Sequence, residues 1–267
     1  MNKKLKKLQQ ILLSMQKVLI AYSGGVDSTL LLKIAVDSLG KENVLAVTAI
    51  SETYTESEKK EAITLSKEIG AKLKIIKTSE FKDKNFVKNP NNRCYYCKKE
   101  LFSKLSKLAK KEGIKYIADG SNKDDLSDYR PGTIAKKEFK IRSPLQESGF
   151  TKNDVREISR NLSLKSWNKP ALACLASRIP YGTKITKDKL NRINQAEEFL
   201  RSLGFVQLRV RDHDNLARIE VDRKEFSKFL SSKISNKIAQ KLKNLGYNYI
   251  TIDILGYRTG SMNEELK

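Results

Sequence analysis

A short glycine-rich segment constrains the fold of this chain more than any other feature. Residues 22–28 read Tyr-Ser-Gly-Gly-Val-Asp-Ser, between a short apolar run at 18–22, typical of a buried strand, and a helical pattern at 29–39. Glycines let the backbone approach a ligand closely, and the start of a helix offers unpaired N–H groups. The segment therefore predicts a phosphate-binding loop, with a plain strand-to-helix turn as the alternative. It has neither the lysine of the Walker loop nor the spacing of the dinucleotide fingerprint.

Strand and helix patterns alternate through the first part of the chain. We predict strands at 18–22, 44–50, 72–77 and 116–119 and helices at 29–39, 56–69, 98–111 and 151–161. An amphipathic helix at 4–16 is expected on the surface. Such alternation is typical of the α/β class with a doubly wound parallel sheet, in which ligands bind at the carboxyl ends of the strands. We assign residues 1–165 to this domain.

The pattern changes after about residue 165, where a loop-like stretch contains Pro170, Pro180 and Gly182. Beyond it we predict helices at 187–203 and 224–245 and strands at 206–211, 217–221 and 249–255. This mixture indicates a small C-terminal α+β domain, residues 166–267. We expect it to bind substrate and to contribute to oligomerisation.

The charge of the chain raises the question of nucleic acid as a partner. Lys and Arg number 53 and Asp and Glu 31, a net charge of +22, but only 13 of the basic residues are arginine. The excess is spread evenly, at +14 over residues 1–165 and +8 over residues 166–267. Lysine often coats a protein surface, whereas nucleic-acid contacts favour arginine. Nucleic acid is therefore not the expected partner.

Composition also indicates the cellular compartment in which the protein is expected. No run of about 18 uncharged apolar residues occurs, so we expect no membrane span. Three cysteines in 267 residues do not make the disulfide framework of a secreted protein. We expect a cytoplasmic protein with reduced thiols.

The three cysteines are candidates for chemistry. Cys94 and Cys97 form a C-x-x-C pair, and Cys174 lies far along the chain. The pair alone fits a redox couple, half a zinc site or half a cluster site. A zinc site would need a fourth ligand, from His213 or a carboxylate. Three thiolates suit a [4Fe–4S] cluster with one open iron. Three unrelated buried cysteines remain an alternative.

The segment 23–28 resembles the pyrophosphate loop of the ATP-pyrophosphatase (PP-loop) superfamily, whose fold is adenine nucleotide alpha hydrolase-like. Those enzymes split ATP between its α and β phosphates and leave an adenylated intermediate. The resemblance implies ATP with Mg²⁺, and adenine near Ser51 at the end of the second strand. It implies that the β and γ phosphates are bound by Ser23, Gly24, Gly25, Asp27 and Ser28.

Further segments resemble the LarE family over about residues 15–260. They are Arg-Cys-Tyr-x-Cys-Lys from Arg93, Asp-Gly-Ser-Asn from Asp119, Asp-Tyr-Arg-Pro-Gly from Asp128, Ala-Cys-Leu-Ala-Ser-Arg from Ala173 and Arg-Val-Arg from Arg209. LarE proteins insert sulfur into a pyridinium dicarboxylate mononucleotide, the precursor of the nickel-pincer nucleotide. The resemblance implies that small-molecule nucleotide as substrate. It also implies a sulfide donor and a downstream nickel-insertion protein as partners, and we expect a homo-oligomer.

In that family the cysteine matching Cys174 is the sulfur site. Members with three cysteines are thought to hold a cluster that carries an extra sulfide, which implies Cys94, Cys97 and Cys174 as ligands here. Members with one cysteine sacrifice its sulfur, and this route is the alternative.

Arginines are the candidate groups for the substrate. Arg209 and Arg211 alternate along a predicted strand and so point to one face, where the family places the substrate phosphate. An ordinary exposed strand face is the alternative. Ser177 and Arg178, beside Cys174, are candidates for substrate contact, and Arg130 for ATP or substrate. Trp167 and His213 are expected to be structural.

Two other functions are open at this stage. A tRNA thiolase of the same superfamily would also adenylate its substrate, but we find no added RNA-binding domain or basic arm. An ammonia-dependent synthetase would also form an adenylate, but it would not need the three cysteines.

Overall fold

The computed structural model describes residues 2–126, 131–170, 173–258 and 260–266. The chain divides into two compact units. The first comprises Met1–Asp83 and Asn92–Leu172, and the second comprises Lys84–Asn91 and Ala173–Lys267. Among the described residues, no helix is both long and apolar enough to cross a membrane.

The first unit is built on a parallel sheet, as the sequence predicts. Its strands are β1 (Val18–Ala21), β2 (Val44–Ile50), β3 (Lys72–Lys77) and β4 (Tyr116–Asp119). They lie in the order β3-β2-β1-β4, and every pair is parallel. A single bridge between Ala118 and Arg142 continues the sheet beyond β4. The two central strands bring the segment after Ala21 to the carboxyl edge of the sheet.

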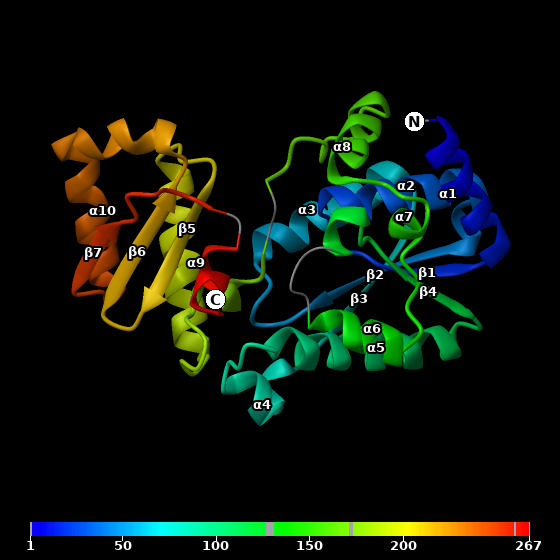
Figure 1. Ribbon diagram of the computed structural model, residues 1–267, viewed down its shortest axis with the longest axis horizontal. Helices are drawn as coiled ribbons and strands as arrows, with labels where there is room; N and C mark the ends of the chain where they lie inside the picture. Colours follow the sequence, from blue (N-terminus) through cyan, green and yellow to red (C-terminus); the bar gives the residue numbers. More distant parts are fainter. Residues whose placement is uncertain (1, 127–130, 171–172, 259, 267) are drawn as a thin grey trace. The chain divides into compact units, whose positions relative to one another are not determined.

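Helices cover both faces of this sheet (Figure 1). On one face lie α1 (Asn2–Met15), α2 (Val26–Leu39), α3 (Glu56–Ile69), α7 (Pro144–Glu147) and α8 (Lys152–Asn161). On the other lie α5 (Arg93–Lys111) and α6 (Gly132–Glu138). Short 3₁₀ turns connect them at η1 (Lys41–Asn43), η2 (Glu80–Lys82) and η3 (Lys123–Leu126). The doubly wound α/β prediction is confirmed.

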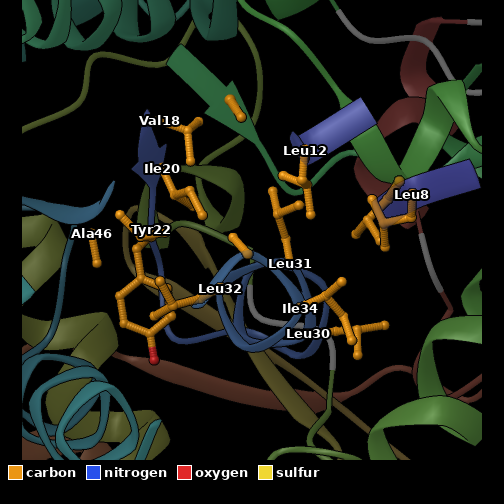
Figure 2. Packing of buried hydrophobic residues seen from close by; sticks show 14 of the residues in the cluster. Leu8, Leu12, Val18, Ile20, Tyr22, Leu30, Leu31, Leu32, Ile34 and Ala46 are labelled. Atoms are coloured by element: carbon orange, nitrogen blue, oxygen red, sulfur yellow. The ribbon is translucent and has the colours of Figure 1, made fainter. Parts of the chain in front are cut away.

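Apolar side chains of α1 and α2 fill the core on the first face (Figure 2). Leu8 and Leu12 of α1 and Leu30 and Leu31 of α2 are fully buried. The amphipathic surface helix expected at 4–16 is confirmed, because its leucine face packs against α2 while its lysine face is exposed. Burying one such leucine contributes roughly 1.5–3 kcal/mol.

Helix ends follow the capping signals in the sequence. Thr55 and Glu58 form a capping box at the start of α3, which ends at left-handed Gly70. Thr151 and Asp154 form the same box at the start of α8. Two predicted starts are wrong: α2 begins at residue 26 rather than 29, and α5 begins at residue 93 rather than 98. The pair of cysteines therefore lies in the first turns of α5.

The second unit has its own sheet and core. Strands β5 (Leu208–His213) and β6 (Leu216–Val221) are antiparallel, and β7 (Tyr249–Ile252) is parallel to β6. Helices α9 (Lys187–Ser202) and α10 (Ser232–Asn244) complete its core, in which Leu200 of α9 and Leu242 of α10 are buried together with Val210 of β5. The predicted helix at 224–245 is instead a 3₁₀ segment, η5 (Arg223–Leu230), followed by α10, with Ser231 between them. Further 3₁₀ turns are η4 (Leu175–Arg178) and η6 (Ser261–Leu266).

A short excursion of the chain, which includes α4 (Lys84–Val87), belongs to the second unit. The fully buried Asn89 holds it there. Its Nδ2 donates to the carbonyl oxygens of Ile179 (3.3 Å), Pro180 (2.7 Å) and Thr183 (3.1 Å). One side chain, with two donor hydrogens, therefore contacts three carbonyl groups of the segment that follows Cys174.

Candidate functional sites in the two units

The glycine-rich segment forms a closed loop between β1 and α2. The hydroxyl oxygens of Ser23 and Ser28 are 3.1 Å apart, and Ser28 Oγ donates to the Gly25 carbonyl at 3.2 Å. Gly25 is the N-cap of α2 and supplies no side chain to cap it. The first N–H groups of α2 are thus left to a ligand, which is the arrangement that binds phosphate at helix starts.

Two glycines allow close packing around this loop. Gly24 has a φ of +73°, and a Cβ there would lie 3.1 Å from Ala62 Cα of α3. A Cβ on Gly120, in the segment after β4, would lie 2.8 Å from Ser28 N. The Asp-Gly-Ser-Asn segment is therefore packed directly on the backbone of the phosphate loop. Sequence reasoning used that segment only as a family marker.

Asp27, in the first turn of α2, has two partners from later in the chain. Asn122 Nδ2 donates to its Oδ1 at 3.0 Å, and Lys152 Nζ forms an ion pair with its Oδ2. Asn122 was noted in the sequence only as part of the Asp-Gly-Ser-Asn segment, and Lys152 was not predicted as a site residue. The carboxylate lies beside the expected phosphate position and offers the oxygen donors that Mg²⁺ prefers, so the residues present fit that ion.

Two more groups bind the loop's carbonyl oxygens. Lys169 Nζ donates to the Gly24 carbonyl at 3.2 Å and pairs with Glu61 at 2.5 Å. The Tyr54 hydroxyl donates to the Ser23 carbonyl at 3.0 Å. Burial, with Glu58 second, raises the pKa of Tyr54 and keeps its hydroxyl a donor.

Another lysine lies at the carboxyl end of β4. Lys136 Nζ pairs with Asp119 at 3.2 Å and donates to the hydroxyls of Ser121 (3.0 Å) and Ser143 (2.8 Å). Ser51 directly follows β2, as the adenine prediction requires, and its hydroxyl contacts that of Thr53 at 2.9 Å. Arg130, the other predicted nucleotide contact, lies outside the described residues.

The cysteine pair belongs to the first unit. Cys94 is exposed, Cys97 is half-buried, and neither is in a disulfide. Cys97 Sγ lies 3.8 Å from Oε1 of the buried Glu80, which also accepts from Thr78. Glu80 Oε2 is buried with no hydrogen-bond partner among the described residues. Cys97 thus lies beside a buried carboxylate, and Cys94 precedes it by three residues on the same helix.

No group of three or more His, Cys, Asp or Glu side chains could hold a metal ion across residues 2–126, 131–170, 173–258 and 260–266. The third cysteine, Cys174, belongs to the second unit. Its side chain is exposed, and it precedes η4 as the N-cap. The set of three cluster ligands remains a prediction.

Arg178 holds the backbone at Cys174 in place. Its Nη1 donates to the carbonyl of Cys174 at 3.0 Å, to that of Ala173 and to the Ser177 hydroxyl at 3.2 Å. Its other nitrogens bind Glu197 of α9 at 2.8 and 3.0 Å. Burial would raise the pKa of Glu197, but Arg178 and then Arg209 and Arg201 lower it to about 2.

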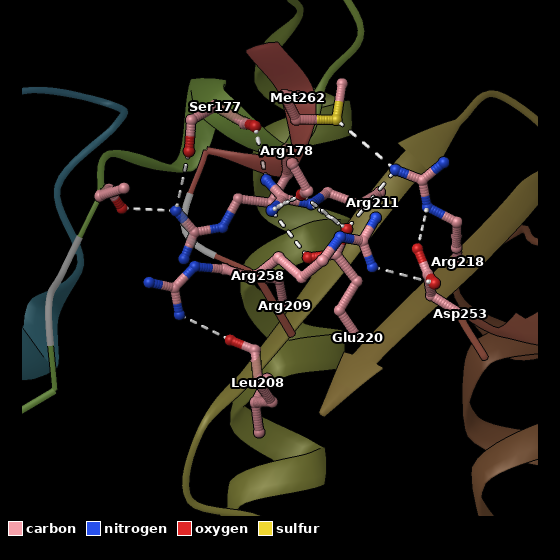
Figure 3. A network of polar contacts seen from close by, with 12 residues as sticks. Ser177, Arg178, Leu208, Arg209, Arg211, Arg218, Glu220, Asp253, Arg258 and Met262 are labelled. Carbon is pink, nitrogen blue, oxygen red and sulfur yellow. Dashed lines mark hydrogen bonds and ion pairs between the residues drawn. The ribbon is translucent and has the colours of Figure 1, made fainter. Parts of the chain in front are cut away.

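Arg209 and Arg211 share one face of β5, as predicted, but that face is buried (Figure 3). The alternative of an exposed strand face is therefore wrong. Arg211 forms a two-point ion pair with Glu220 at 2.9 and 2.7 Å and donates to the Ser177 carbonyl at 2.9 Å. Arg209 lies over the Tyr257 ring, 5.1 Å from its centre.

We call Arg178, Arg209, Arg211, Glu197 and Glu220 the arginine cluster. Its three buried guanidinium groups exceed its two buried carboxylates by one charge. Burial, with the like charge of Arg178 second, lowers the pKa of Arg209 to about 10. The cluster therefore contains more buried guanidinium groups than buried carboxylates, an arrangement that favours an anion.

Comparison with known proteins shows the family to which a chain with this phosphate loop and arginine cluster belongs. The sequence profile of the NAD synthase family matches residues 2–94, which contain the phosphate loop. A Lactiplantibacillus plantarum protein named pyridinium-3,5-bisthiocarboxylic acid mononucleotide synthase is 42% identical over 94% of this chain and 91% of its own length. The chain belongs to the LarE family of that synthase.

Two uncharacterised proteins are also similar along their length to this LarE-family chain. One from Synechocystis is 44% identical over 100% of the chain and 99% of its own length. One from Methanocaldococcus jannaschii is 35% identical over 91% of the chain and 92% of its own length. The resemblance seen in the sequence is confirmed, and the LarE-family chain is an ATP-using enzyme of the PP-loop type.

Proposed function

We propose that the chain inserts sulfur into pyridinium-3,5-biscarboxylic acid mononucleotide in an ATP-dependent reaction that gives the thiocarboxylate. The observation that carries this proposal is the 42% identity, over nearly the whole chain, to a synthase named for the bisthiocarboxylic acid mononucleotide. The phosphate loop and the arginine cluster supply, in separate units, places for ATP and for an anionic substrate.

The first step uses the phosphate loop. A carboxylate oxygen of the substrate attacks the α-phosphorus of ATP, and the bond to the β-phosphate oxygen breaks. The product is an acyl-adenylate, and pyrophosphate leaves into the loop of residues 23–28. The N–H groups at the start of α2, which no side chain of Gly25 caps, and the hydroxyls of Ser23 and Ser28 would stabilise the developing charge. Bound Mg²⁺ would neutralise phosphate charge beside Asp27.

The arginine cluster supports binding of the substrate's phosphate and carboxylates. Arg209 and Arg211 point to one face, and guanidinium groups bind such anions at two points. Ser177 adds a hydroxyl beside Cys174, and Arg178 keeps that segment in place. We propose Arg209 and Arg211 as the principal substrate-binding residues.

The second step transfers sulfur. A sulfur nucleophile attacks the activated carbonyl carbon and displaces AMP. We propose Cys174 as the site of this transfer, because its side chain is exposed while its backbone is fixed by Arg178. We also propose that Cys94, Cys97 and Cys174 hold a [4Fe–4S] cluster, which when bound would supply the sulfide. In the alternative, the Cys174 thiolate attacks the activated carbonyl and displaces AMP, which gives a thioester. Loss of the Cα proton and cleavage of the Cβ–Sγ bond then release the thiocarboxylate and leave dehydroalanine at position 174.

One assay separates this function from its rivals. Anaerobically prepared protein is incubated with ATP, Mg²⁺ and sulfide, and the mononucleotide is compared with bulk tRNA as acceptor. We expect pyrophosphate release and a thiocarboxylate product with the mononucleotide only. Transfer to tRNA alone would overturn the proposal in favour of a tRNA thiolase, and amide formation with ammonia would favour a synthetase.

A further inference from the structure

We propose that Lys152 binds the phosphates of ATP and, alongside Mg²⁺, bridges Asp27 and the pyrophosphate. The inference rests on the ATP use of the proposed function and adds a residue that sequence reasoning did not place in the site. Its basis is the ion pair between Lys152 Nζ and Asp27 Oδ2, which joins the start of α8 to the phosphate loop.

The position of Lys152 is fixed by its surroundings. It is the first residue of α8, directly after Thr151, whose capping box sets the start of the helix. Its backbone N–H donates to Asp124 Oδ2 at 2.8 Å. Val155 and Ile158 of the same helix are buried in the core shared with α2. The side chain therefore starts from a rigid point close to the loop.

Charge explains why a cation is needed there. Asp27 lies in the first turn of α2, which is the end of the helix that also attracts phosphate. A carboxylate and a polyphosphate at the same helix start repel each other unless a positive group lies between them. The Lys152 ammonium already contacts the carboxylate and has three donor hydrogens, so it can bind both anions at once.

Two other lysines near the loop are less suited to this role. The side chain of Lys169 is 11% exposed and is used by Glu61 and the Gly24 carbonyl. That of Lys136 is 14% exposed and is used by Asp119, Ser121 and Ser143. Lys152 is 30% exposed and its partner Asp27 22%, so this ion pair is open to an incoming ligand.

The test is calorimetric titration of the full-length protein with pyrophosphate, with and without Mg²⁺. We expect Lys152→Ala to raise the Kd about 10- to 100-fold, the effect of losing a charge-assisted hydrogen bond, and Lys152→Arg to stay within about fivefold. Lys4→Ala is the matched control, because it removes the ion pair with Asp154 at the same end of α8. Its Kd is expected to equal that of the wild type.

A second variant separates contact from simple neutralisation of Asp27. If Lys152 only cancels the charge of Asp27, the double variant Asp27→Asn/Lys152→Ala will bind pyrophosphate without Mg²⁺ as the wild type does, and the inference is overturned. We expect its affinity to stay low. A folded Lys152→Ala variant with wild-type affinity, or a wild type that does not bind pyrophosphate, would also overturn it. A wild type that binds pyrophosphate but transfers no sulfur contradicts only the proposed function.

Discussion

Arg178 and Glu197 form a two-point ion pair with almost no solvent exposure, at 2% and 1% of their side chains. Glu197 also accepts hydrogen bonds from Arg201 (2.8 Å) and from the backbone N–H of Val210 (3.2 Å). The carboxylate thus joins α9, β5 and the segment that carries Cys174. Because its own pKa is held at about 2, it stays ionised through neutral and mildly acidic pH.

Glu197→Gln should therefore change the acid stability of the second unit. The ordinary pKa of this carboxyl is 4.5 and the folded value is about 2, so the stabilisation is complete above pH 4.5 and is lost as the pH falls toward 2. Over that interval the wild-type free energy of unfolding should fall by on the order of 3 kcal/mol more than that of the variant. At pH 7 the variant should be less stable by about 3–5 kcal/mol, because Arg178 stays buried without a charged partner.

Hydrogen exchange of β5 and β6 amides in urea, measured across this pH range, would show the effect in the second unit itself. Glu198→Gln is the control, since Glu198 is exposed on the same helix and accepts a hydrogen bond from the side chain of Asn194 at 3.1 Å. Equal acid sensitivity of the wild type and Glu197→Gln would contradict the assignment.

Gly120→Ala should weaken ATP binding through packing alone. The added methyl group would lie 2.8 Å from Ser28 N and 3.0 Å from Ser28 Cα, so the phosphate loop or the segment after β4 must move. We expect the Kd for ATP to rise at least tenfold, or about 1.4 kcal/mol, by equilibrium binding. Gly113→Ala is the control. A methyl group there meets no atom within 4 Å, so its only effect is the backbone strain of alanine at a φ of +65°. That variant should lose stability but keep ATP affinity.

Much of the first unit can be predicted from the sequence because local signals and tertiary structure agree. The apolar run before Ser23 must be buried, the glycines break it, and the capping pairs at Thr55 and Thr151 mark helix starts. The loop's position at the carboxyl edge then follows from the parallel sheet. The ion pair of Lys152 with Asp27 could not be predicted, because 125 positions separate the two residues.

The second unit was less predictable, for reasons of packing. Alternation correctly places Arg209 and Arg211 on one face, but an arginine in a strand normally indicates an exposed face. Arg211 is buried against its ion-pair partner Glu220 of β6, and Arg209 is buried near the negative charge of Glu197 on α9. The helix expected at 224–245 is in fact a 3₁₀ segment and an α-helix separated at Ser231. The sequence did not reveal the break, because the periodicity of so short a 3₁₀ segment resembles that of an α-helix.

Arg209→Lys tests the proposed binding of the substrate phosphate. Arg209 keeps its charge in a buried place where burial and Arg178 already lower its pKa to about 10. A lysine there starts from a lower pKa, so a larger fraction of it should be neutral at pH 8 than at pH 6. We expect the Kd for the mononucleotide to rise at least tenfold at pH 8 and to recover partly at pH 6.

Calorimetric titration at the two pH values measures this directly. The control is Arg223→Lys, because Arg223 is an exposed arginine of the same unit whose side chain contacts the Ile254 carbonyl at 3.5 Å. An affinity of Arg209→Lys that matches the wild type at both pH values would remove Arg209 from the substrate site.

Cysteine substitutions separate activation of the substrate from delivery of sulfur. Cys94→Ser and Cys97→Ser alter the start of α5 and leave the phosphate loop intact, so mononucleotide-dependent pyrophosphate release should stay within about twofold of the wild type. Sulfur transfer and iron content should both fall to background if the three thiols hold a cluster. Ser106→Ala on the same helix is the control and should change neither.

Mass spectrometry of the Cys174 peptide after turnover identifies the source of the transferred sulfur. A mass loss of about 34 Da, which is one hydrogen sulfide, would mean that Cys174 is consumed as the nucleophile. An unchanged peptide together with iron-dependent transfer is the outcome we expect.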